Sequence, residues 1–129
     1  FPEVYGIVCD WNIGDHVASI VSMKDGMASL YTTSTFGIIG GEGHERVREA
    51  ARRLVVEAGR FHNMAKVVTE SPYPMSGKVN YYLLTYGGVR LLVGDEKAIE
   101  AGTDPTSSLF VAAQDVLTEL RRIAEAKMK

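Results

Sequence analysis

A glycine-rich turn at residues 35–48, TFGIIGGEGHERVR, is the stretch of this sequence that most resembles a ligand-binding motif. Four of its first nine residues are glycines: Gly37, Gly40, Gly41 and Gly43. Helical periodicity begins directly after them, near His44. Backbone N–H groups at such a junction bind phosphate in many proteins, because the helix N-terminus carries partial positive charge. Phosphate binding is therefore the first chemistry to consider.

The residues around the glycines argue against a phosphate loop. A P-loop needs a lysine directly after its last glycine, and a dinucleotide fingerprint needs a third glycine where Arg46 stands. Glu42 and Glu45 also bring carboxylates to the place that an anion would occupy. We therefore expect a simple strand-to-helix turn. The alternative is a site for a neutral or cationic ligand, formed by Gly40, Gly41, Gly43 and His44.

Cys9, the only cysteine, is the second chemical candidate, since a thiol beside a histidine can act as a nucleophile. Alternation along residues 4–11 places it on the same strand face as Ile7 and Trp11. We expect a buried and unreactive thiol there. The least favoured hypothesis is an enzyme that uses Cys9 or His44, and we expect no catalytic residue.

The spacing of the histidines gives no support for metal ligation. His16, His44 and His62 are never three or four residues apart, and none stands near Cys9 in a spacing typical of zinc sites. We therefore expect neither a metal site nor a cofactor.

Composition and charge describe an ordinary globular chain. It has 129 residues, of which 46% are hydrophobic and 23% charged, with a net charge of −2. Such a charge gives no general attraction to nucleic acid or to acidic membranes, so neither is an expected partner. With one cysteine, no leader-like N-terminus and no apolar run of about 20 residues, the sequence predicts a cytoplasmic protein. Its length suits a single domain over residues 1–129.

Hydrophobic periodicity predicts five main strands and two helices. The strands are expected at residues 4–11, 17–23, 27–36, 78–86 and 89–93. The helices are expected at residues 44–61 and from about residue 105 onward, the second capped by Thr103 or Asp104. Asp25-Gly26 and Gly87-Gly88 favour tight turns between neighbouring strands. Residues 66–70 could add a short edge strand, and residues 94–105 could hold one helical turn.

These elements close one core if the helices lie on an antiparallel sheet. We predict an α+β fold, with a five-stranded antiparallel sheet, two helices packed on one face and the order β-β-β-α-β-β-α.

This layout resembles the roadblock, longin and profilin-like group of small domains, which often act as dimeric adaptors or regulators. Several short segments are also similar to a set of small bacterial proteins of unknown role. Examples are Ser29-Leu30-Tyr31, Gly37-Ile38-Ile39-Gly40, Leu84-Thr85-Tyr86 and Leu109-Phe110. The resemblance implies a fold and a tendency to dimerise, and it carries over no functional residue.

The apolar content of the expected sheet points to a surface for a partner. Residues 78–86 carry large apolar side chains on both faces, whereas two helices cover only one. Four tyrosines would add aromatic surface for an interface: Tyr5, Tyr31, Tyr82 and Tyr86. We therefore expect a non-enzymatic, homodimeric protein-interaction or regulatory domain. A small-molecule sensor, with its pocket beside the glycine-rich turn or the loop at residues 70–77, is the alternative.

Overall fold

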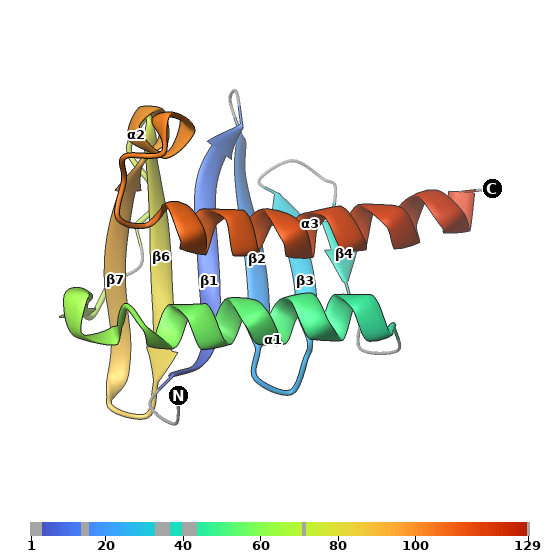
Figure 1. Ribbon diagram of the computed structural model, residues 1–129, viewed down its shortest axis with the longest axis horizontal. Coiled ribbons are helices and arrows are strands. Elements are labelled where there is room, and N and C mark those ends of the chain that lie inside the picture. The colour runs from blue at the N-terminus through green and yellow to red at the C-terminus, as the bar shows by residue number, and fades with distance from the viewer. Residues whose placement is uncertain (1–3, 14–15, 33–36, 40–43, 71, 129) are drawn as a thin grey trace.

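A seven-stranded antiparallel sheet forms the framework of the protein in the computed structural model, which describes residues 4–13, 16–32, 37–39, 44–70 and 72–128 (Figure 1). The strands lie in the order β4-β3-β2-β1-β6-β7-β5. Their bounds are β1 Val4–Ile13, β2 His16–Met23, β3 Ala28–Thr32, β4 Gly37–Ile39, β5 Lys66–Val68, β6 Lys78–Thr85 and β7 Gly88–Asp95. The sheet therefore joins the two halves of the chain through the central pair of β1 and β6.

Tight turns connect the strands at the predicted Asp25-Gly26 and, one residue earlier than the predicted Gly87-Gly88, at Tyr86-Gly87. Between β2 and β3, Gly26 adopts a φ of 97°, and the backbone N–H of Met27 donates to Asp25 Oδ1 over 3.0 Å. Glycine is suited to this turn because a side chain disfavours positive φ. Between β6 and β7, Thr85 Oγ1 donates to the carbonyl oxygen of Gly88 over 2.5 Å.

Two long helices lie side by side across one face of the sheet and run in opposite directions (Figure 1). They are α1 at Glu45–Gly59 and α3 at Ser107–Met128. A short 3-10 turn at His62–Met64 follows α1, and a six-residue helix, α2 at Glu96–Ala101, precedes α3. Each long helix buries an apolar stripe against the sheet, including Leu54 from α1 and Leu120 from α3.

The start of α3 shows how the sequence fixes a helix boundary. Asp104 Oδ1 accepts hydrogen bonds from the backbone N–H and the hydroxyl of Thr106, over 2.7 and 2.6 Å. The carboxylate thus satisfies an N–H group that would otherwise lack a partner at the helix start. Of the two residues expected to cap this helix, Asp104 is the one that does so.

The α+β class, the two helices on one face and the order of the five main strands are confirmed. The predicted count of five strands is two short, because three-residue strands extend both edges of the sheet. One is β5, at the position that could form an edge strand. The other is β4, which falls inside the expected glycine-rich turn and pairs with β3, Leu30 opposite Ile38. The single helical turn expected before α3 is α2.

Candidate functional site

The face of the sheet opposite α1 and α3, here called the open face, is the candidate functional site. Cross-strand pairing fixes which side chains lie on it, because residues directly opposite each other in a sheet point to the same side. Val8 pairs with Val21 of β2 and with Tyr82 of β6, which in turn pairs with Leu91 of β7. These four strands therefore place a row of large side chains on the open face, in which Tyr82 is buried and Val8, Val21 and Leu91 are half-buried.

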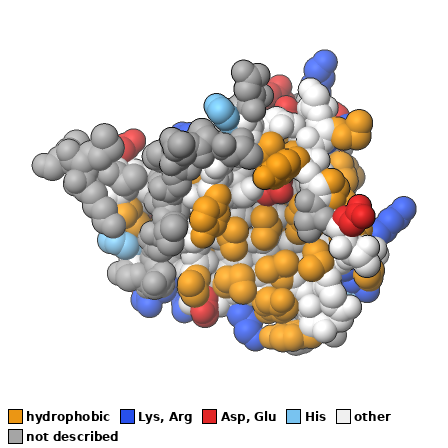
Figure 2. Space-filling model, turned by 180° about the vertical axis from the view of Figure 1, so that it is seen from behind, with side chains coloured by type: hydrophobic (Ala, Val, Ile, Leu, Met, Phe, Trp, Pro, Cys, Tyr) orange, Lys and Arg blue, Asp and Glu red, His pale blue; other side chains and the backbone are white. Residues whose placement is uncertain are grey.

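The apolar row broadens into a patch that extends toward the end of the sheet with the β6–β7 turn (Figure 2). Met23, Leu84 and Val89 lie on this face between the row and that turn, and Val93 lies on the other side of the row, opposite Asn80. Most of these side chains are half-buried, and Val93 is 49% exposed. Large contiguous apolar patches mark interaction sites more often than scattered apolar residues do.

The four tyrosines expected at an interface do not gather in one cluster. Tyr31 lies on the open face of β3, opposite Ser19, and is 44% exposed. Tyr82 lies on the same face but is buried. Tyr5 and Tyr86 contact each other at the end of the sheet, with ring centroids 5.0 Å apart. The Tyr86 ring is mostly exposed, and its hydroxyl accepts a hydrogen bond from Lys24 Nζ over 2.6 Å.

A loop at residues 72–77 is anchored to the polar end of the open face by side chains of β1 and β6. The Tyr82 hydroxyl donates to the carbonyl oxygen of Pro72, and Asn80 Nδ2 donates to the same oxygen over 3.3 Å. Asn12 Nδ2 donates to the carbonyl oxygens of Pro74 and Met75 over 3.3 and 3.2 Å. These bonds explain why the apolar strand β6 contains Asn80, a polar residue whose partners the sequence alone does not reveal.

Asp10 is the most unusual polar residue on the open face. It lies between Ser19 and Asn80 in the strand register and is only 6% exposed. Its Oδ1 atom accepts no hydrogen bond from the residues that the structure describes. Burial raises the pKa of the Asp10 carboxyl, and a side-chain hydrogen bond with Ser19 offsets part of that shift. The sequence marks Asp10 only as a charged residue in a strand, since burial depends on tertiary packing.

A cavity of about 370 Å³ opens beside the anchored loop, at the β5 edge of the sheet. Its walls come from β5, the start of the loop and β7: Val67, Val68, Thr69, Glu70, Pro72 and Leu91. The volume lies within the range of small-ligand pockets, but the hollow is open to solvent, and its walls combine apolar side chains with Thr69 and Glu70. This location agrees with the loop named in the small-molecule alternative.

Of the four residues expected to form a ligand site at the glycine-rich turn, the structure describes one. Gly40, Gly41 and Gly43 lie outside the described residues, and His44 is the exposed N-cap residue of α1. No side-chain capping bond forms at His44. The ligand site expected from these four residues stays a prediction.

The Cys9 thiol lies in the core under the helices and is completely buried. Burial raises the pKa of Cys9, and the charge of Asp10 raises it further, so the thiol stays protonated at neutral pH. The thiolate, which is the nucleophilic form, is thus disfavoured. The residue opposite Cys9 in β6 is Tyr81, which is also fully buried. Among the described residues, no three of His, Cys, Asp and Glu are grouped to hold a metal ion.

Comparison of the chain with protein families, with curated protein sequences and with solved structures finds no match in any of the three. Within the described part of the chain, no helix is both long and apolar enough to cross a membrane. The geometry of the open face therefore carries the functional argument.

Proposed function

We propose that the chain is a non-enzymatic protein-interaction domain that forms a homodimer through its open face. The observation that supports this proposal is the contiguous apolar patch on the side of the sheet that α1 and α3 leave uncovered (Figure 2). Burial of such side chains in an interface removes apolar surface from water, at about 25 cal/mol per Å².

A second copy of this chain is the occupant that best fits the open face. Under twofold symmetry the same patch meets itself, so an apolar row faces an equally apolar row. Two sheets can pack face to face in this way at a separation of about 10 Å. The net charge of −2 means that two copies repel each other only weakly.

The edges of the sheet are less suited to dimerisation than its open face. Both edge strands, β4 and β5, are three residues long, and β5 begins with the exposed Lys66. Short edge strands that carry lysine oppose pairing with another sheet. Resemblance in layout to the roadblock, longin and profilin-like group, which includes dimeric adaptors, favours the same interpretation. A single buried thiol further favours a reducing compartment such as the cytoplasm.

A matched pair of valine substitutions tests the homodimer. Val93 on the open face and Val111 on the outer side of α3 are 49% and 58% exposed. We expect the wild type to show a concentration-dependent monomer–dimer equilibrium in sedimentation velocity. Val93→Asp should weaken dimerisation at least tenfold, because two carboxylates enter an apolar interface. Val111→Asp should leave the equilibrium unchanged.

Circular dichroism of both variants checks that each still folds. A wild type that stays monomeric up to several hundred micromolar contradicts the proposal. So does an equilibrium that Val111→Asp disrupts and Val93→Asp does not, since the interface would then lie on the helices.

The cavity beside the anchored loop supports a second candidate function, the binding of a small molecule. Its apolar walls and the carboxylate of Glu70 favour a mainly apolar ligand that is neutral or positively charged. A thermal-shift screen against metabolites tests this function, because a ligand at 100 times its Kd stabilises the folded state by about 2.7 kcal/mol. Pro72→Ala and Leu91→Ala variants should lose any shift that arises from this cavity. A broad panel without a shift removes the support for a sensor.

A further inference from the structure

A second, smaller pocket lies away from the open face, between the end of β1, helix α2 and the start of α3. It encloses about 210 Å³ and is lined by Trp11, Glu96, Ile99, Glu100 and Phe110. A water molecule occupies about 30 Å³ in the liquid, so the pocket holds a group of roughly seven waters in volume. This volume is enough for a small polar or charged group and too small for a nucleotide.

Two aromatic rings form one side of this pocket. Trp11 of β1 and Phe110 of α3 have ring centroids 6.1 Å apart and an interplanar angle of 82°. Pairing of Trp11 with Ala18 of β2 and Val79 of β6 places the indole on the helix-covered side of the sheet. Trp11 is largely buried, and Phe110 is half-buried, so the rings are held by the core while part of the Phe110 surface stays accessible.

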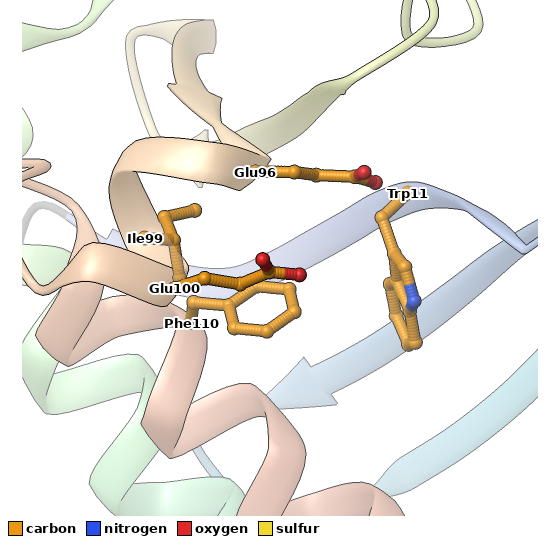
Figure 3. A pocket seen from close by; sticks show the side chains of 5 residues that line it. All are labelled: Trp11, Glu96, Ile99, Glu100 and Phe110. Carbon is orange, nitrogen blue, oxygen red and sulfur yellow. The ribbon is translucent and has the colours of Figure 1, made fainter.

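Two carboxylates complete the pocket from the other side. Figure 3 shows Glu96 and Glu100 of α2 extending toward the indole of Trp11, with the Phe110 ring beside Glu100. Neither side chain forms an ion pair or a hydrogen bond with any residue that the structure describes. Asp95, directly before them, differs: it accepts a hydrogen bond from Lys78 Nζ over 2.9 Å and another from the N–H of Ala98 over 3.0 Å.

We propose that this pocket binds an organic ammonium group, either on a free small molecule or on a peptide side chain. A cation is attracted to the face of an aromatic ring, and Trp provides the strongest such attraction. Two unpaired carboxylates add a favourable field for a positive charge and repel anions. The apolar walls, including Ile99, suit the methyl or methylene groups that surround an organic ammonium and would be poor ligands for a metal ion.

The ammonium site and the homodimer are independent of each other. Trp11 lies on the helix-covered side of the sheet, whereas the dimer uses the open face. Failure of one proposal therefore leaves the other intact.

The experiment follows the indole N–H resonance of Trp11 by NMR in ¹⁵N-labelled protein. The chain has one tryptophan, so this single peak reports directly on the pocket. Titration with choline chloride tests a free ammonium compound, and titration with a short peptide that contains trimethyllysine tests a side chain. Sodium chloride at equal concentration controls for ionic strength, and 3,3-dimethyl-1-butanol is the neutral analogue of choline.

We expect a saturable shift of the Trp11 resonance with at least one of the two ammonium probes. The probe that binds more tightly shows whether the ammonium group belongs to a free small molecule or to a peptide side chain. The neutral analogue should bind about twofold to thirtyfold more weakly, the range expected for a cation–π contact. A double variant, Glu96→Gln with Glu100→Gln, should weaken binding of the ammonium probe and leave the neutral analogue unaffected. Glu49→Gln, an exposed carboxylate on α1, is the matched control and should change nothing.

Phe110→Leu keeps an apolar wall and removes the ring, so it should also weaken ammonium binding. The proposal is overturned if neither ammonium probe gives a saturable shift, or if the neutral analogue binds as tightly as choline. Equal binding by the wild type and the double glutamine variant overturns it as well.

Discussion

On the helix-covered face of the sheet, Ile7, Tyr81 and Leu83 are completely shielded from solvent, whereas Val8 and Leu84 on the open face keep part of their surface exposed. The same strands supply both sets, since neighbouring residues point to opposite sides. Near the β6–β7 turn the two faces thus both carry apolar side chains and differ in what covers them, whereas toward the other end the open face becomes polar at Asp10 and Asn80. The helix-covered face forms the core of the monomer, and the open face holds apolar surface that a partner can bury.

Leu83 and Leu84 allow the largest and most direct comparison of the two faces. They are adjacent in β6 and chemically identical, but Leu83 is completely buried and Leu84 is only partly buried. Leu83→Ala should lower the free energy of unfolding by about 2–5 kcal/mol, because it leaves a cavity in the core. Leu84→Ala should lower it by less than about 1.5 kcal/mol, because its side chain already contacts water. Urea denaturation of dilute protein measures both values.

Dimerisation should respond in the opposite order. Leu84→Ala should weaken it, whereas Leu83→Ala should leave it nearly unchanged in the population that stays folded. Equal losses of stability in the two variants would mean that the open face is as well packed as the core.

Asp10→Asn should have a smaller effect, with the opposite sign. The substitution keeps the shape of the side chain and removes the charge, so the desolvation of a buried carboxylate disappears. We expect a gain in stability of about 1 kcal/mol at pH 7, the size typical of one buried polar group. Thermal denaturation of both proteins between pH 3 and pH 8 measures it.

The pH dependence of this gain follows from the raised pKa of Asp10. The folded state holds the proton more tightly than the unfolded state, whose carboxyl has the ordinary pKa of 3.8. The wild type therefore loses stability as the pH rises above 3.8 and through the raised pKa. The advantage of Asp10→Asn should appear in the same window and vanish below it. An advantage that is constant with pH would assign the gain to packing instead.

The sequence is sufficient to predict the class of fold, since its signals are local. The Asp25-Gly26 turn and the Asp104 cap of α3 are short patterns whose chemistry works in any context. The apolar strand at residues 78–86 likewise indicates a sheet with two apolar faces. The short edge strands and the pockets depend instead on contacts between elements that are distant in the sequence. The β4 strand is recognisable only once β3 lies beside it, and the pocket at Trp11 joins residues from three separate elements.

The candidate site was only partly accessible from sequence for the same reason. Tyrosine content indicates an aromatic surface, but the fold buries Tyr82 beneath the anchored loop and separates Tyr31 from the Tyr5–Tyr86 pair. Val8, Val21 and Leu84 define the open face more clearly than the tyrosines do. That they share one face is known only from the strand register.

The smallest expected effects concern the outer surface of the helices. Val56 of α1 and Val111 of α3 are 56% and 58% exposed and line a shallow apolar groove between the two helices. Val56→Ser and Val111→Ser should each change the free energy of unfolding by less than about 0.5 kcal/mol. Neither should alter the monomer–dimer equilibrium in sedimentation. A loss of dimerisation in either variant would move the interface from the open face to this groove.

Intermolecular NMR contacts show whether the open face is the dimer interface. An equal mixture of ¹³C-labelled and unlabelled protein reports only the contacts that cross between two copies. We expect intermolecular contacts among the methyl groups of Val8, Val21, Leu84 and Leu91. Intermolecular contacts confined to Val56 and Val111, or none at all at millimolar concentration, would contradict it.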